Sequence, residues 1–156
     1  MIMEKVKAPS LSITLRINEI KILLFETTQR VIEILDPLSN DSYEFRFDLK
    51  TETSEEEKIF SNLLFITLFE KQSDLVKVEL VKLHTLTTFK IQNFDEIIKK
   101  KDGVIQVPKQ LIPLTAGISI STARGILTVN LKDTKISNAI IPIINPQSFL
   151  VVKKEK

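Results

Sequence analysis

The chain has 156 residues, of which 43% are apolar and 27% are charged. This length and composition are typical of a globular domain and too apolar for a disordered chain, so we expect residues 1–156 to form a single domain. Lysine and arginine number 22 against 20 aspartates and glutamates, and this balance gives no reason to expect a nucleic-acid partner. The lack of cysteine excludes disulfides, thiolate zinc sites and cysteine nucleophiles.

Two features bear on where the protein works. Residues Met1 to Ser10 carry charged side chains and have no apolar stretch of the kind found in a secretory signal. No segment approaches the ~18 consecutive apolar residues that a membrane-spanning helix needs. We therefore expect a cytoplasmic protein that does not insert into membranes.

The first strands are predicted from alternating apolar and polar residues, the period of two that a half-buried strand shows. The alternation begins at Ser12 and slips by one position at Asn18-Glu19, which predicts a β-bulge. A short β-rich stretch from Val31 to Leu35 ends at the turn residues Asp36-Pro37.

Three later stretches complete the predicted sheet. The alternation from Tyr43 to Leu49 is the clearest, so one face of the sheet should be wet. Leu63 to Phe69 is almost continuously apolar, which predicts a central strand covered on both faces. The stretch from Val76 to Ile91 is again β-rich, and four main strands joined by short connections imply antiparallel pairing.

The pattern after residue 106 is ambiguous. Val107 to Leu111 resembles the start of a helix, and apolar residues recur beyond it at helical spacing, with Pro113 tolerable only in the first turn. Ile118 to Ser121 also alternates like a strand, so periodicity alone leaves helix and strand open. If the segment is a helix, Arg124-Gly125 suits its C-terminal end, and Ile126 to Leu131 is then predicted to be extended.

Shorter signals frame this segment. Asp95 to Lys99 is typical of a short helical turn, and Asp102-Gly103 of a tight turn. Asn145-Pro146 resembles an N-cap followed by proline in the first position of a last short helix.

No constellation of residues indicates catalysis. His84 is the only histidine and lies in a strand pattern. An enzyme built around His84 and Glu79 is one hypothesis for the function, and it is weaker than the two binding functions considered below. The carboxylates of Glu55 to Glu57 follow one another without a glycine-shaped loop, which is more typical of a solvated turn than of a metal site. The three glycines are too scattered to wrap a phosphate. We expect no catalytic residue, no metal and no cofactor.

Three segments of the C-terminal half form an ordered set: Ile112-Pro113-Leu114, then Ile118 to Leu127, then Ile141 to Pro146. The middle segment includes the sequence Thr-Ala-Arg-Gly. Between roughly Pro108 and Leu150 this set resembles the SecB and SecB-like chaperones, in which it also follows four strands.

The resemblance implies an α+β subunit, in which a four-stranded antiparallel sheet has helices packed on one face. It implies that the segment from Pro108 to Arg124 is helical, and that subunits form a homo-oligomer, a tetramer built as a dimer of dimers. The implied activity is ATP-independent holding of unfolded or newly synthesised polypeptides in apolar grooves, a function in protein export that needs no catalytic residue.

We distinguish two sets of site residues. Those that match the family motif, to which we assign structural roles, are Arg124, Gly125, Pro142, Asn145 and Pro146. Those that we select for contact with polypeptide clients are Phe45, Phe47, Phe65, Phe69, Leu114 and Ile118. For any single phenylalanine a place in the core is favoured, and a place in a groove for extended apolar polypeptide is the alternative.

The family leaves a second hypothesis open. Its export chaperones are markedly acidic and pass clients to the SecA motor partly through acidic surface, so the near-neutral charge of this chain speaks against docking to SecA. The family also includes SecB-like chaperones that protect one antitoxin. The alternative function is therefore that of a dedicated adaptor or chaperone for one specific partner, such as an antitoxin.

Overall fold

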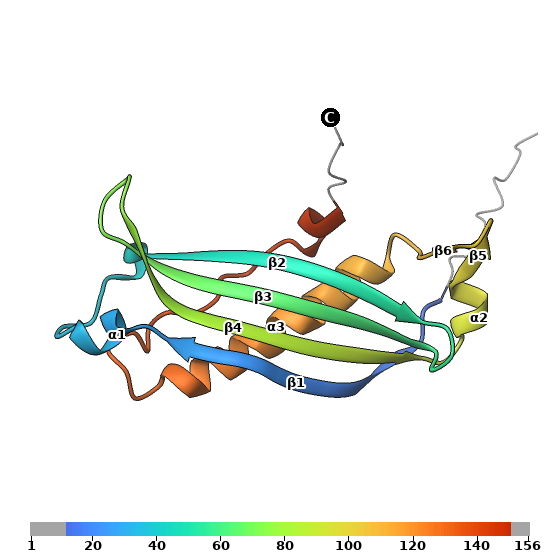
Figure 1. The fold of residues 1–156 in the computed structure, drawn as a ribbon, viewed down its shortest axis with the longest axis horizontal. Helices are drawn as coiled ribbons and strands as arrows, with labels where there is room; N and C mark the ends of the chain where they lie inside the picture. Colours follow the sequence, from blue (N-terminus) through green and yellow to red (C-terminus); the bar gives the residue numbers. More distant parts are fainter. Residues whose placement is uncertain (1–11, 151–156) are drawn as a thin grey trace, which may run out of the picture.

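Four long strands dominate the computed structural model, which describes residues 12–150 (Figure 1). Each neighbouring pair is antiparallel, and the order across the sheet is β1-β4-β3-β2. The strands are β1 (Leu15–Thr27), β2 (Tyr43–Ser54), β3 (Ile59–Lys71) and β4 (Lys77–Ile91). The predicted α+β fold with a four-stranded antiparallel sheet is therefore confirmed. Residues Met1 to Ser10 lie outside the described residues.

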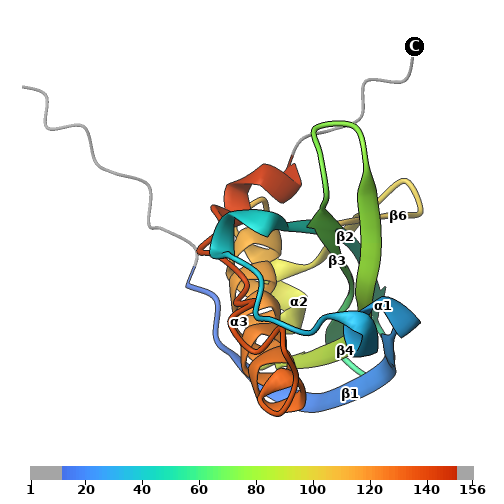
Figure 2. The ribbon, with the colours of Figure 1, turned by 90° about the vertical axis from the view of Figure 1, so that its left-hand side faces the viewer.

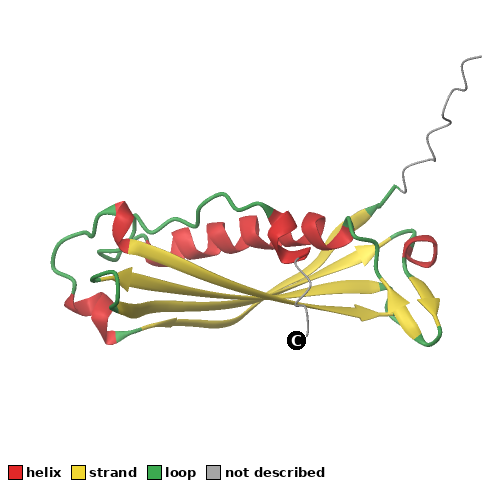
Figure 3. Ribbon diagram, turned by 90° about the horizontal axis from the view of Figure 1, so that it is seen from above, coloured by secondary structure: helices red, strands yellow, loops and turns green. Residues whose placement is uncertain are grey.

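A single long helix, α3 (Leu111–Leu131), covers one face of this sheet. Figures 2 and 3 show α3 running along that face, while no helix of the described residues lies across the other. By length and composition α3 could cross a bilayer, but nine of its residues are buried within the fold. Such burial is typical of a core helix.

Strand β3 is central, as predicted, because it pairs with both β2 and β4. Its even-numbered residues from Asn62 to Glu70 are buried, whereas the odd-numbered residues between them are only half-buried. The prediction that both faces of this strand are covered was therefore wrong. The reason is that α3 covers one face alone, and the continuous apolar run places Leu63 and Phe65 on the outer face.

Strand β1 shows the predicted irregularity. Its pairing with β4 shifts register between Ile17 and Glu19, where the alternation slips in the sequence, and again between Ile22 and Leu24. Each shift absorbs one residue, and bulges of this kind bend a strand and interrupt its exposed edge.

The predicted strand from Val31 to Leu35 was wrong, because the chain forms helix α1 (Gln29–Glu33) there. Val31 and Ile34 are both buried, and their spacing of three suits one side of a helix. Contacts made by the preceding residues favour this turn, since the Thr28 backbone N–H donates to the Leu80 carbonyl at 2.9 Å and its hydroxyl to the Glu79 carbonyl at 2.7 Å.

Helix α3 resolves the ambiguity after residue 106. Pro113 is the third residue of the helix and so lies in its first turn, as required. The predicted end at Arg124-Gly125 and the extended stretch Ile126 to Leu131 were wrong, because the helix continues to Leu131. Burial of Leu127 and Leu131 in the core outweighs the helix-weakening effect of glycine.

The remaining elements are short. The predicted turns at Asp95 and at Asp102-Gly103 are confirmed as helix α2 and as the link between two three-residue strands. Asn145 caps the last helix, since its Oδ1 accepts from the Gln147 backbone N–H at 3.1 Å. These elements are η1 (Asn40–Ser42), α2 (Phe94–Ile97), β5 (Lys99–Lys101), β6 (Val104–Gln106) and η2 (Pro146–Leu150).

Candidate functional site

Among residues 12–150, no group of three or more His, Asp or Glu side chains is placed so that it could hold a metal ion. His84 lies on the outer face of the sheet, with its ring edge-on to that of Phe65 and 4.7 Å between the centroids. The described part of the chain contains two grooves, which are the candidate sites considered below.

The first groove lies between the start of β2 and the segment that follows α3. Its volume is about 330 Å³. The lining combines an aromatic and aliphatic floor with two amides and a phenol. We call it the Tyr43 groove, and the residues that line it are Asn40, Tyr43, Phe45, Asn138, Ile140 and Pro142.

One side chain organises the polar wall of the Tyr43 groove. The Asn138 Oδ1 accepts from the Tyr43 hydroxyl at 2.7 Å, and its Nδ2 donates to the Leu38 carbonyl at 2.7 Å and to the Asn40 Oδ1 at 3.0 Å. Burial, and secondly the nearby charge of Glu70, raises the pKa of Tyr43. The phenol therefore stays a neutral hydrogen-bond donor at physiological pH.

The second groove lies beside helix α1, and its volume is about 390 Å³. Two of its apolar side chains point largely into solvent, since Ile32 is 74% exposed and Leu35 is 81% exposed. We call it the α1 groove, and the residues that line it are Val31, Ile32, Ile34, Leu35, Asp133, Thr134 and Lys135.

An ion pair with two hydrogen bonds anchors α1 to the sheet. The Arg30 guanidinium donates to both carboxylate oxygens of Glu70, at 2.7 and 2.8 Å. The hydrogen bond from Arg30 holds the pKa of Glu70 below its usual value, although burial opposes this. Because the pair is planar and bidentate, it fixes the orientation of α1 as well as its position.

The residues selected for client contact lie in three separate places. Phe45 and Phe47 face the α3 side of β2 and pack against the core, with 6.2 Å between their stacked rings, and Phe45 also lines the Tyr43 groove. Leu114 is exposed on α3, whereas Ile118 is partly buried against the core.

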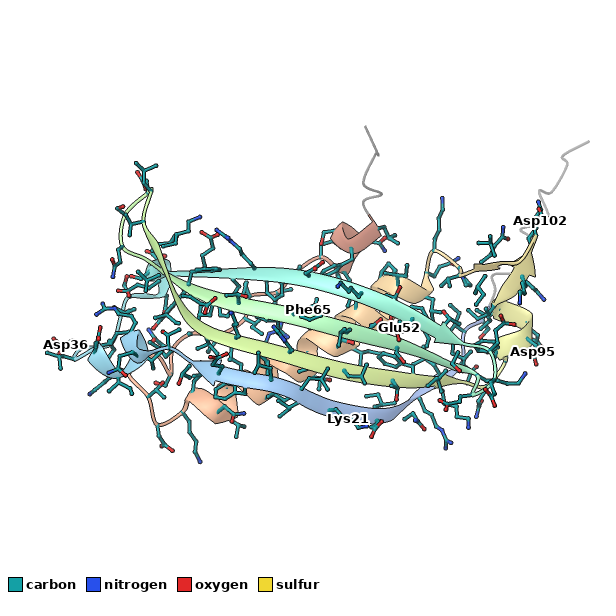
Figure 4. The ribbon with its side chains drawn as sticks, viewed as in Figure 1. Lys21, Asp36, Glu52, Phe65, Asp95 and Asp102 are labelled. Atoms are coloured by element: carbon teal, nitrogen blue, oxygen red, sulfur yellow. The ribbon has the colours of Figure 1, made fainter. Side chains whose placement is uncertain are left out.

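Phe65 and Phe69 lie on the opposite, outer face of the sheet. Figure 4 shows Phe65 on the face that is turned away from α3. The Lys50 ammonium lies 5.4 Å from the centroid of the Phe65 ring, and the Arg46 guanidinium lies 4.5 Å from that of Phe69. Because Phe65 and Phe69 lie on the opposite face of the sheet from Phe45 and Phe47, the six residues do not form one continuous site.

The motif residues tie α3 to the segment after it. The Arg124 guanidinium donates to the carbonyls of Ile141 and Pro142 at 2.8 and 2.9 Å, and Pro146 packs beside Gly117. Gly125 instead lies in the helix interior with open space around it.

Sequence reasoning missed most of the groove residues. Asn40 and Asn138 fall in stretches that read as turn and loop, Ile140 begins a stretch that reads as extended, and the strand predicted at Val31 to Leu35 concealed the α1 groove. A signal was nevertheless present, because a spacing of three between Val31 and Ile34 leaves Ile32 and Leu35 outside the core on a helix.

Exposed apolar side chains also lie on β1, the edge strand of the sheet, and on α3, and we call these residues together the apolar edge surface. The helix contains no aspartate, glutamate or lysine, and its single arginine is bound to carbonyls. The isoleucines of β1 in this surface pair with buried residues of β4 that face α3. Its exposed residues are Ile17 (44%), Ile20 (43%), Ile22 (50%), Leu23 (52%), Leu114 (44%) and Val129 (65%).

We compared the sequence and the fold of this chain with those of known proteins. No protein-family model matches the sequence, and no curated protein matches it. Among solved structures, the chain is similar to the SecB-like chaperone Rv1957 of Mycobacterium tuberculosis, which was solved in complex with a ChAD peptide from the Rv1956 HigA1 antitoxin. The two share a TM-score of 0.55 over 83% of this chain and 90% of that one, at 10% sequence identity.

The fold of this chain is SecB-like. At 10% identity the likeness concerns the fold and not the residues of a site. Within the SecB-like fold of this chain, both grooves border the stretch that connects α1 to β2, and the apolar edge surface lies along β1 and α3.

Proposed function

We propose that this chain is an ATP-independent holding chaperone that binds unfolded or newly synthesised polypeptides. The observation that carries the proposal is the pair of apolar-lined grooves beside the α1–β2 connection on a SecB-like fold. Exposed apolar surface of this kind is typical of interaction sites rather than of an inert surface.

The linings suit side chains of an extended polypeptide. Each groove has the volume of a small binding pocket. The Tyr43 groove offers aromatic rings next to amides, which can accommodate an apolar side chain and the polar backbone beside it. The α1 groove is lined by aliphatic side chains and also by Asp133 and Lys135. It therefore suits an apolar side chain of the client whether the neighbouring client residue is acidic or basic.

The solved SecB-like neighbour favours a second candidate. That protein was captured with an antitoxin peptide. The alternative is therefore that this chain serves one dedicated partner through the same grooves. A general holding chaperone should bind many unrelated unfolded proteins, whereas a dedicated one should be indifferent to them.

Aggregation measured by light scattering separates the two candidates. Two unrelated denatured proteins are diluted into buffer with and without this chain, in the absence of ATP. Suppression of both supports a general holding chaperone. Suppression of neither contradicts it and leaves the dedicated partner as the candidate.

A pair of variants then tests the grooves themselves. Leu35→Asp places a charge in the α1 groove at a side chain that is 81% exposed, so folding should be unaffected. We expect the dissociation constant for a denatured client to rise about tenfold, since a desolvated charge costs more than the ~1.4 kcal/mol that corresponds to this factor. Val104→Asp is the matched control, because Val104 is 64% exposed on β6 and lines neither groove. Equal affinities of the two variants would exclude the α1 groove as a client site.

We also propose that copies of this chain associate, as a dimer or as a tetramer built from two dimers. The uncharged surface of α3 and the apolar edge of β1 support this, because monomers rarely leave such a surface open. Light scattering should show an oligomer at micromolar concentration, and Val129→Lys should shift it toward smaller species. A monomeric wild-type chain would contradict the proposal.

We do not extend the proposal to the SecA motor, because a net charge of +2 provides no acidic excess for docking. The proposed place of action is the cytoplasm, because a chain without cysteine needs no oxidising compartment to form disulfides. Cell fractionation tests this, and recovery in a membrane or secreted fraction would contradict it.

A further inference from the structure

The two grooves share the same pair of chain stretches as walls. The connection between α1 and β2 contributes Leu35 to the α1 groove and Asn40 to the Tyr43 groove. The stretch after α3 contributes Lys135 to the α1 groove and Asn138 to the Tyr43 groove. The shape of both grooves therefore depends on how these two stretches lie against each other.

A single side chain joins them by hydrogen bonds. The amide of Asn138 donates both to the Leu38 carbonyl and to the Asn40 Oδ1, and it accepts from Tyr43. These contacts span 95 to 100 positions in the sequence. Within the part of the chain that the structure describes, no other hydrogen bond joins residues 35–42 to a distant stretch, since the bonds between Ser39 and Ser42 are local.

Apolar packing provides the remaining attachment of this connection. Ile34 is buried at its start, and Leu38 packs partly buried against the core. Between and beyond them, Leu35 and Asn40 are exposed. Packing of two side chains leaves the backbone of the connection free to shift, whereas the three hydrogen bonds of Asn138 define one position.

We propose that Asn138 is a positioning residue that holds the α1–β2 connection against the stretch after α3 and so sets the shape of both grooves together. The expected effect on client binding rests on the proposed function, because the shape of the grooves determines how tightly clients bind. The amide is needed for its chemistry, since two donors face Leu38 and Asn40 and one acceptor faces Tyr43.

This chemistry predicts an order among variants. Asn138→Asp keeps the shape of the side chain but replaces both donors with a carboxylate that faces two acceptors. It should therefore release the connection at least as strongly as Asn138→Ala. Tyr43→Phe removes only the third hydrogen bond and should have a smaller effect. A side chain that acted through packing alone would tolerate the Asp variant and not the Ala variant.

Proteolysis of the full chain measures the release without any client. A protease that cleaves after large apolar residues can cut after Leu35 and Leu38 in the connection and after Leu75, which is 95% exposed in the β3–β4 hairpin, and neither Asn138 variant adds a site for it. We expect cleavage at the first two sites to be about tenfold faster in both Asn138 variants, with an intermediate rate in Tyr43→Phe. Cleavage after Leu75 is the internal control and should not change.

The affinity for a denatured client, measured on the same variants, tests the consequence. We expect binding to both Asn138 variants to be at least fivefold weaker than to the wild-type chain. Unchanged cleavage in both variants would overturn the positioning role, and faster cleavage with unchanged affinity would overturn its effect on the grooves. If the wild-type chain binds no client, the proposed function fails, and the cleavage rates alone still decide the positioning role.

Discussion

Replacing Gly125 with alanine should stabilise this protein. The sign of the change in stability distinguishes a glycine inside helix α3 from a glycine that ends it. Gly125 lies inside α3 without a positive φ, and a Cβ added there would meet no atom within 4 Å. Glycine inside a helix costs ~1 kcal/mol relative to alanine because the unfolded chain gains more freedom. We therefore expect Gly125→Ala to raise the free energy of unfolding by about 1 kcal/mol.

A glycine that ends a helix would respond in the opposite way. Such a residue usually has a left-handed conformation, which alanine adopts at a cost of ~1 kcal/mol. Gly103, between β5 and β6, provides the control because its φ is +78° with no atom within 4 Å of an added Cβ. Gly103→Ala should lower the free energy of unfolding by about 1 kcal/mol, through backbone strain alone.

Urea unfolding followed by circular dichroism measures both changes. With a slope of about 2 kcal/mol per molar urea, each variant should shift the midpoint by about 0.5 M, in opposite directions. The protein should be dilute enough to be monomeric, because Gly125 lies on the surface proposed for association. Destabilisation by Gly125→Ala under these conditions would refute the position of this residue inside the helix.

Four further outcomes are expected. Leu127→Ala should lower the free energy of unfolding by about 3 kcal/mol, because the side chain is 1% exposed and its removal would leave a cavity. A loss below about 1 kcal/mol in urea unfolding would contradict the burial of Leu127. Arg124→Met should accelerate proteolysis of the segment after α3, because its two hydrogen bonds to carbonyls are lost. The Arg30–Glu70 pair should lose its contribution to stability as the pH falls below the usual carboxyl pKa of 4.5, because the folded-state pKa of Glu70 is lowered. The urea midpoint should therefore fall less between pH 7 and pH 4 in Arg30→Met than in the wild-type chain, and an equal fall would contradict the role of the pair. His84→Ala should leave the suppression of aggregation unchanged, and abolition would instead indicate that clients contact the outer face of the sheet at His84 and Phe65.

The strands could be predicted because their signal is local. A sheet with one covered face imposes an alternation that is visible within a few residues, as in Tyr43 to Leu49. The slip at Asn18-Glu19 likewise marked a real shift in register. The helix α1 could not be assigned in this way, because five residues are too few to show a period and its anchor, the contact between Arg30 and Glu70, spans 40 positions.

Local sequence patterns were therefore enough to indicate four antiparallel strands and a central β3, but not the order β1-β4-β3-β2, which brings β1 next to β4 and not next to β2. Only the tertiary structure decided where α3 ends, because burial of Leu127 and Leu131 against the sheet outweighs the local preference of Gly125. It also decided where the grooves lie. Their walls come from stretches about 100 positions apart that Asn138 joins, and no pattern of neighbouring residues encodes a contact between such distant parts of a chain.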